Sequence, residues 1–478
     1  MRIKLSTYDG ILLAIPLFLC LLLRFFGYDG NSGQDSYAYT GYTQALQNWM
    51  HTGIKPISFF WPPGYPLVGA VLSLGFLPAS AILQFVSSIS LGITLLYLYR
   101  LTLKLSTEDT VAKSSFLFFL IWGLFAPFVF RNSVANTSDM LACCMIAGAI
   151  YHYIMYLHHT KYIDLFLATL FISYGVFTRY VTILVFLPII IHIILHWGKN
   201  GFIFRHATVL LIPVGILLMY FYFAGFNARF IKHPYLSSWS VDNYFSTHFY
   251  TPEGKLTYFF PNIVYILYPL FFPGFCIPGF LFFIKSLLYP LLNRAYFVTL
   301  MLSFILFSLF LAGNYGQNPR HLLGIYPVVL ILCFGGFHSI HLWLSSTGVW
   351  KYILPALILI QILLCARALY PTIKRNKLER YLSKEILSYS QNSNNVLYSF
   401  DIDIALKHRQ NKIKIKNLND SVYTYYLPHS LVLINETKWM VQWQNKNPMI
   451  NFSNLNYNHH LTKLKSYEDG WNLYRIEP

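Results

Sequence analysis

Four charged side chains have the types and the setting that a transfer reaction on a phosphate-linked substrate needs. Asp35 and Asp139 are carboxylates, Arg179 and Arg320 are guanidiniums, and each lies between apolar stretches. A positioned carboxylate can take the proton of an attacking hydroxyl as a general base. A guanidinium binds phosphate oxygens with two parallel donors and keeps its charge. Together these residues suit the transfer of a group from a lipid phosphate to an acceptor, if the fold brings them together.

The elements that must position these residues are membrane-spanning helices. The chain has 478 residues, of which 56% are hydrophobic and only 11% are charged, whereas soluble proteins carry about a quarter charged residues. Apolar runs long enough to cross a bilayer recur through residues 1–370. We therefore expect an all-α polytopic membrane protein with about eleven transmembrane helices and additional interfacial helices.

The distribution of basic residues predicts the orientation. The net charge of +17 comes from Lys and Arg in short loops and in the tail, which is typical of a protein that follows the positive-inside rule and not of a nucleic-acid binder. With a cytoplasmic N-terminus, and with 64–77 lying at the interface instead of spanning, all four charged residues fall on the outer side. The spans hold almost no charge at mid-depth, which argues against a transporter, whose sites lie near the bilayer midplane.

The chain is expected to divide into a membrane domain, 1–370, and an extracytoplasmic α/β domain, 371–478. The membrane domain would carry a first outer loop at 28–66 and a long outer loop at 226–261. The tail is polar, and its short β-like runs alternate with helical stretches. The runs are Val396–Phe400, Lys412–Ile415, Ser430–Ile434 and Trp471–Ile476.

The order of these motifs resembles the GT-C superfamily of membrane glycosyltransferases, most closely the branch of the protein O-mannosyltransferases and the lipid A aminoarabinose transferases. The resemblance covers about residues 8–370, and the tail is similar to the small extracytoplasmic domain that many members carry. Asp139 after the third span also matches the pattern. The motifs that carry the resemblance are Gln34-Asp35-Ser36-Tyr37, Pro62-Pro63-Gly64-Tyr65-Pro66-Leu67, Thr178-Arg179 and Asn318-Pro319-Arg320.

The resemblance implies a glycosyltransferase that moves a sugar from a polyprenyl-phosphate donor to a hydroxyl or an amine. The acceptor would be a cell-envelope glycan, lipid or protein at the outer face of the plasma membrane. A single displacement with one carboxylate base predicts inversion at the anomeric carbon. The implied roles are Asp35 as the base, Asp139 in orienting a substrate, Arg179 and Arg320 on the donor phosphate, and Tyr37, Tyr65 and His321 as further substrate contacts.

The predicted partners are the donor, the acceptor and membrane lipids, and no obligatory cofactor is expected. A divalent metal is not favoured, because the first outer loop contains no Glu and because His233, His248 and Glu253 fit no tight ligand spacing. Arg24 and Arg131 are interpreted as interfacial residues that reach lipid headgroups. Two alternatives stay open: a flippase or transporter of lipid-linked glycans, and a non-catalytic assembly subunit. Replacement of Asp35 by Asn would distinguish them from a transferase.

Overall fold

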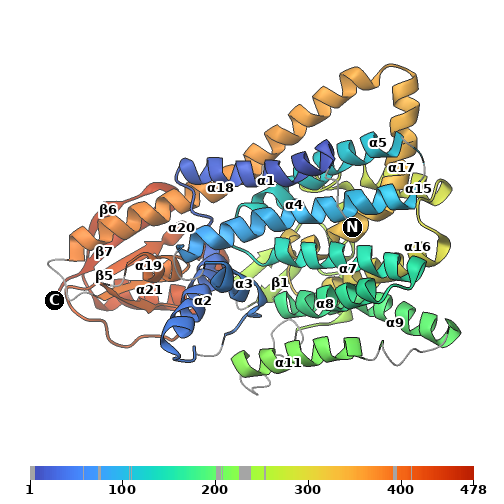
Figure 1. Cartoon of the computed structure of the whole chain (residues 1–478). Coiled ribbons are helices and arrows are strands. Elements are labelled where there is room, and N and C mark those ends of the chain that lie inside the picture. The colour runs from blue at the N-terminus through green and yellow to red at the C-terminus, as the bar shows by residue number, and fades with distance from the viewer. Residues whose placement is uncertain are drawn as a thin grey trace.

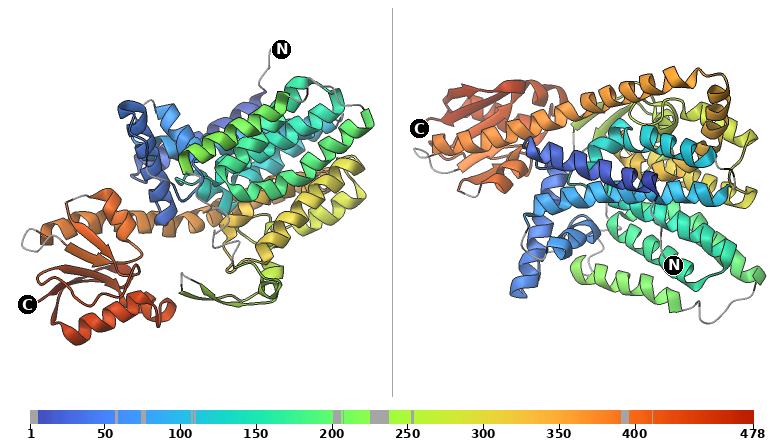
Figure 2. Two further views of the ribbon diagram at one scale, coloured as in Figure 1. Left: turned by 90° about the horizontal axis from the view of Figure 1, so that it is seen from below. Right: turned by 45° about the horizontal axis from the view of Figure 1, so that its top comes forward.

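The structure is a computed structural model of the whole chain, and most of its residues are described. They form a bundle of long helices with a β-containing domain at one end (Figures 1 and 2). The described residues are 6–56, 59–73, 77–106, 108, 110–200, 206, 208–224, 238–251, 254–390, 396–410 and 412–478.

Seven helices of the described chain are long and apolar enough to cross a membrane, or eight if one bent pair is a single span. The bent pair is α5 (Thr110–Phe118) with the π-helix η1 (Phe119–Leu124), followed after a 72° bend by α6 (Pro127–Ser133). The others are α1 (Thr7–Phe25), α4 (Ala79–Leu105), α7 (Asp139–His159), η2 with α9 (Tyr180–Thr182, Ile183–Asn200), α16 (Arg294–Ala312), η5 with α17 (Pro319–Ile325, Tyr326–Ser346) and α18 (Trp350–Ser390).

At three further places where we expected a span, the structure has a shorter apolar helix. These are α8 (Tyr162–Thr178), α11 (Leu211–Ala224, preceded by the 3-10 turn η3, Thr208–Leu210) and α15 (Gly279–Leu288). Helix α8 packs between α7 and α11 in the same bundle (Figure 1). The prediction of an all-α polytopic membrane protein with a small β-containing C-terminal domain is confirmed. The count of about eleven spans stays a prediction for these three helices, which are shorter than the usual minimum of about 17 residues or only reach it.

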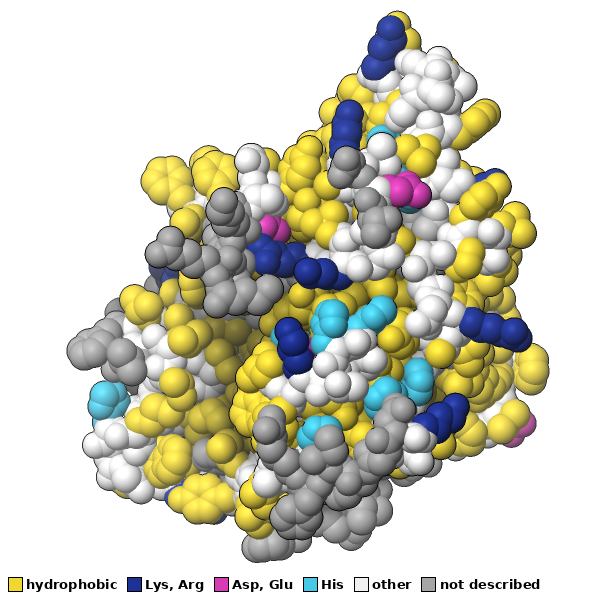
Figure 3. All heavy atoms as spheres, turned by 45° about the vertical axis from the view of Figure 1, so that its right-hand side comes forward, with side chains coloured by type: hydrophobic (Ala, Val, Ile, Leu, Met, Phe, Trp, Pro, Cys, Tyr) yellow, Lys and Arg dark blue, Asp and Glu magenta, His cyan; other side chains and the backbone are white. Residues whose placement is uncertain are grey.

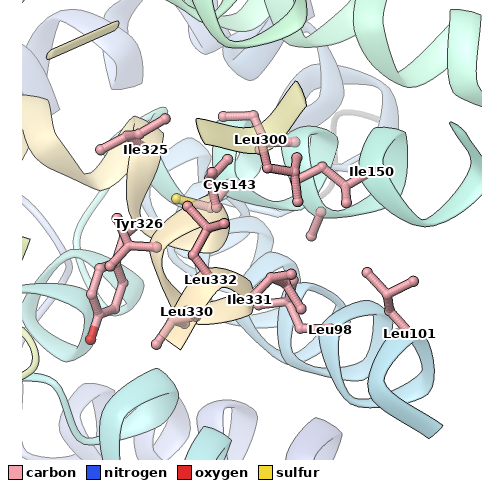
Figure 4. Close-up of a cluster of buried hydrophobic side chains, with 14 of the residues drawn as sticks. Leu98, Leu101, Cys143, Ile150, Leu300, Ile325, Tyr326, Leu330, Ile331 and Leu332 are labelled. Carbon is pink, nitrogen blue, oxygen red and sulfur yellow. The ribbon is translucent and has the colours of Figure 1, made fainter. Parts of the chain in front are cut away.

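The most deeply buried spans, α7 and α17, are apolar on all sides, as helices in the centre of a bundle are. Figure 4 shows Leu98 of α4 close to Ile331 of α17, and Cys143 of α7 close to Leu332. A Cβ at Gly336 of α17 would collide with the carbonyl of Phe282, so glycine is required for the close approach of α15. This packing fixes α17, and therefore also η5, which precedes it directly.

The expected first outer loop is largely helical. It contains α2 (Gly33–Thr52), which stands away from the bundle beside the C-terminal domain (Figure 2), and α3 (Gly64–Ser73), which is ten residues long and too short to span. The described part of the long outer loop holds a 3-10 turn and an antiparallel hairpin. Its elements and the two short helices after them are η4 (Val241–Tyr244), β1 (His248–Thr251), β2 (Gly254–Thr257), α13 (Asn262–Tyr265) and α14 (Tyr268–Phe271).

The C-terminal domain contains a five-stranded sheet with the order β4-β3-β5-β7-β6. Strand β3 is parallel to β4 and β5, whereas β7 is antiparallel to β5 and β6. All four predicted runs contribute to the sheet, and β6 was not predicted. The expected domain boundary at residue 370 lies inside α18, which continues through Pro371, so that boundary stays a prediction. The elements are β3 (Val396–Ser399), α19 (Asp403–Arg409), β4 (Lys414–Asn417), β5 (Leu431–Asn435), α20 (Glu436–Gln442), α21 (Asn447–Asn458), β6 (Leu461–Ser466), η6 (Glu468–Gly470) and β7 (Trp471–Ile476).

Candidate active site

Arg320 joins the two predicted acids. Its Nη1 donates to Oδ2 of Asp35 at 2.6 Å, and its Nε donates to Oδ2 of Asp139 at 2.5 Å. The guanidinium of Arg179 forms an ion pair with the other oxygen of Asp139. The structure therefore brings all four predicted charged residues together, although they lie up to 285 positions apart in the sequence. We call Asp35, Asp139, Arg179 and Arg320 the charge cluster.

Each member of the charge cluster lies at the end of a helix. Asp35 is in the first turn of α2, inside the expected first outer loop, and Asp139 is the first residue of α7. The positive end of the helix dipole stabilises a carboxylate at such a position. Arg179 lies between α8 and η2, and Arg320 lies in η5, where Asn318 caps the turn by accepting from the backbone N–H of Arg320 at 3.1 Å.

The chain segment before α2 is locked to the segment before α7. The backbone N–H of Asn136 donates to the Gly30 carbonyl at 2.9 Å, and its side-chain amide donates to Oδ1 of Asn31 at 2.8 Å. Gly30 has a φ of +80°, and a Cβ there would collide with the Asn136 side chain. Glycine is therefore needed at this contact, which holds the starts of α2 and α7 beside each other.

The two carboxylates differ in accessibility. The side chain of Asp139 is 0% exposed, that of Asp35 is 37% exposed, and both guanidiniums are 17% exposed. Asp139 is therefore unable to meet an acceptor and can instead hold the two arginines in place. Asp35 is the acid of this pair that a substrate hydroxyl can reach.

The three other predicted substrate contacts lie in different settings. The hydroxyl of Tyr37 donates to Glu379 at 2.5 Å and the hydroxyl of Tyr65 donates to the Leu83 carbonyl at 2.8 Å, so both are engaged in packing. His321 follows Arg320 in η5 and is half-buried, with its backbone N–H bonded to Asn318. A substrate contact by any of the three stays a prediction, and for Tyr37 and Tyr65 these partners disfavour it.

Sequence reasoning missed a second polar network, which joins the start of α2 to the tail. Arg409 of α19 donates from Nη1 to Asp29 at 3.1 Å and from Nε to the Tyr37 oxygen at 2.9 Å, while Asn376 of α18 donates to Asp29 at 2.6 Å. Burial acts to raise the pKa of Asp29, but Arg409 and the Asn376 amide outweigh it and lower that pKa. We call Asp29, Tyr37, Asn376, Glu379 and Arg409 the tail clamp. Its partners lie more than 340 residues apart, and no local pattern in the sequence signals it.

Of the three residues considered above as metal ligands, only His248 lies in the described part of the chain. His233 and Glu253 lie outside the described residues, and Nδ1 of His248 is hydrogen-bonded to the Thr257 hydroxyl at 3.2 Å. Among the described residues no three His, Cys, Asp or Glu side chains are grouped as a metal site requires. Between Asp35 and Asp139 the positive charge is supplied by Arg320.

Comparisons with known proteins give a match at the level of fold. No protein-family model matches the chain, and no curated protein matches it. The crystal structure of ArnT from Cupriavidus metallidurans bound to undecaprenyl phosphate is similar with a TM-score of 0.57 and 11% identity, over 98% of both chains. The apo structure of the same protein gives a TM-score of 0.55 with 11% identity, again over 98% of both chains.

The chain therefore has a GT-C-like fold, as these structural neighbours do. The likeness to ArnT, a lipid A aminoarabinose transferase, extends over nearly the whole length of the chain, including the tail. The resemblance inferred from the sequence motifs is confirmed at this level.

Proposed function

We propose that this protein is a membrane glycosyltransferase that takes a sugar from a polyprenyl-phosphate donor. The observation that carries the proposal is the charge cluster, in which Arg320 joins a reachable carboxylate, Asp35, to a buried one, Asp139, at one end of a GT-C bundle. The similar ArnT structure contains undecaprenyl phosphate, which supports a polyprenyl phosphate as the lipid carrier here. A carboxylate beside guanidiniums is the minimum that a single displacement from a lipid phosphate requires.

In the proposed reaction the donor phosphate binds to the accessible edges of Arg320 and Arg179. The acceptor hydroxyl gives its proton to Asp35 while its oxygen bonds to the anomeric carbon. The bond from that carbon to the phosphate oxygen breaks, and the polyprenyl phosphate leaves as an anion that the guanidiniums stabilise. Attack from the side opposite to the leaving group gives inversion.

The pairing of Arg320 with Asp35 couples donor binding to activation of the base. Nη1 of Arg320 is engaged by Asp35 in the structure, and a phosphate that takes this donor releases the carboxylate for the acceptor. Asp139 keeps Arg320 oriented during the exchange, because it holds the Nε of the same guanidinium. The base is therefore freed only after the donor has bound.

We infer that the charge cluster and the tail lie on the outer side of the plasma membrane. The opposite end of the bundle carries Lys104, Lys199, Lys285, Arg294 and Lys351 at or next to helix ends, which is the distribution that the positive-inside rule gives for a cytoplasmic face. Figure 3, turned toward that end, shows Lys, Arg and His side chains gathered on an otherwise largely hydrophobic surface. A cell-envelope glycan, lipid or protein would then be the acceptor.

Label transfer tests the proposal against its alternatives. Purified protein in nanodiscs is given a polyprenyl-phospho-sugar labelled in the sugar, with envelope fractions of cells that lack the protein as the source of acceptor. We expect the label to move from the lipid phosphate to envelope material, with release of polyprenyl phosphate. A flippase or an assembly subunit leaves the sugar–phosphate bond intact, so label that stays on the lipid in every fraction would overturn the proposal.

A further inference from the structure

The charge cluster by itself is electrically balanced. Two carboxylates, Asp35 and Asp139, face two guanidiniums, Arg179 and Arg320, and every one of them has an ion-pair partner within the cluster. A site that binds an anionic lipid phosphate works best with surplus positive charge. The source of that surplus has to lie next to the cluster.

Arg131 of α6 has the properties of this source. Helix α6 packs against η5, which carries Arg320, so the two arginines lie on neighbouring elements. The guanidinium of Arg131 lies over the ring of Phe128, 5.2 Å from the ring centroid. In the described part of the chain, Arg131 forms no ion pair with a carboxylate, whereas Arg179 and Arg320 both do.

This environment is unfavourable for a cation unless an anion joins it. Arg131 is half-buried, so it has lost part of its hydration, and its charged neighbour has the same sign. Removal of a charge from water is costly when no opposite charge compensates it. The contact with Phe128 offsets only a small part of this desolvation free energy, because a single cation–π contact is weak.

The packing of α6 argues against an ordinary lipid-facing arginine. Helix α6 contacts α4, α7, α18 and η5, and its Pro127, Val129, Phe130, Asn132 and Ser133 are buried. The sequence-based interpretation of Arg131 as a residue that simply reaches the bulk headgroups is therefore disfavoured. Its environment instead suits one specific anion held between α6 and η5.

We propose that Arg131 completes the phosphate-binding site of the lipid donor together with Arg320 and Arg179, and that it is the arginine of this site that is not neutralised by an acid. The inference rests on the proposed function and extends it to a residue outside the charge cluster. The chemistry recognised is a phosphate ester on a lipid. Because bulk phospholipids carry the same group, the experiment must separate the two sources.

The experiment measures binding of undecaprenyl phosphate to the full chain in nanodiscs of zwitterionic lipid. The variants are Arg131→Gln, Arg131→Lys and, as a matched control, Arg24→Gln, because Arg24 is also a half-buried arginine at this end of the bundle but is hydrogen-bonded to Gln84 at 3.1 Å. We expect Arg131→Gln to weaken binding by roughly 10- to 100-fold, the value of a charged hydrogen bond. Arg131→Lys should lose less, and Arg24→Gln should bind as the wild type does.

Two further arms assign the outcome. With an excess of phosphatidylglycerol, the wild type should still bind undecaprenyl phosphate more tightly than Arg131→Gln does. If this lipid displaces undecaprenyl phosphate from the wild type, Arg131 binds bulk lipid and the inference is overturned. Equal affinity of the wild type and Arg131→Gln for undecaprenyl phosphate would overturn the inference as well. Equal weakening in Arg131→Lys and Arg131→Gln would also overturn it, because it would indicate that both variants lose the fold and not only the charge. A wild-type protein that does not bind undecaprenyl phosphate would instead count against the proposed function.

Discussion

Replacement of Asp139 by Asn should destabilise the protein strongly. The carboxylate is fully buried and is shared by Arg179 and Arg320, so the substitution removes the negative charge from two ion pairs at once. A hydrogen bond to a charged group is worth about 1.5–3 kcal/mol, which gives about 3–6 kcal/mol for the two. Arg320 keeps Asp35 as a partner, and both guanidiniums are 17% exposed, so they regain some hydration. We therefore expect the free energy of unfolding to fall by about 3 kcal/mol, the lower end of this range.

The assay is thermal unfolding in detergent, with Asp35→Asn as the matched control. Asp35 also pairs with Arg320 but is 37% exposed, and an ion pair so accessible to water contributes about 1 kcal/mol or less. The apparent melting temperature should therefore fall by several degrees in Asp139→Asn and stay near the wild-type value in Asp35→Asn. Equal melting temperatures for Asp139→Asn and the wild type would refute the claim that Asp139 holds the two arginines.

Three further predictions concern the tail and its orientation. Arg409→Ala should detach the tail from α2 and increase hydrogen exchange in α2 and α19. Lys412→Ala, which removes an exposed side chain, should leave the exchange in both helices unchanged. Equal exchange in the two variants would mean that the tail clamp does not hold the tail. Because the folded-state pKa of Asp29 lies below its unfolded value of about 3.9, the clamp should stabilise docking above that pH and lose strength as the pH falls through the lower pKa. Asp29→Asn should abolish this dependence, measured as acid-induced exchange in α2, and an unchanged profile would contradict the assignment. A cysteine at Tyr457, which is 91% exposed, should react with an impermeant thiol reagent in intact cells against a background of buried native cysteines, and labelling only after lysis would place the tail inside.

The membrane architecture was predictable because it is encoded locally. A run of apolar residues as long as a bilayer is thick identifies a span without knowledge of its neighbours. The alternation of spans then placed Asp35, Asp139, Arg179 and Arg320 on one side. Their assembly into one cluster is the three-dimensional consequence of that alternation.

The contacts between distant side chains were not predictable in the same way. The resemblance implied that Tyr37, in the same motif as Asp35, contacts a substrate. Residues two positions apart on a helix point in different directions, and the Tyr37 hydroxyl is bonded to Glu379. The burial of Asp139 depends on the packing of α7, and its sequence neighbours do not reveal it. The interpretation of Arg131 as a lipid-facing residue rested on its position near a span end, which does not show that α18 and η5 cover α6.

The most direct test of the central claim is turnover in Asp35→Asn. The amide keeps the size and hydrogen-bonding capacity of the side chain but is unable to accept a proton at neutral pH. We expect transfer from a labelled polyprenyl-phospho-sugar to fall by roughly 100-fold or more, the usual contribution of a positioned base. Donor binding should be at least as tight as in the wild type, because Arg320 is released from its partner. Full turnover in Asp35→Asn would contradict the assignment of Asp35 as the base.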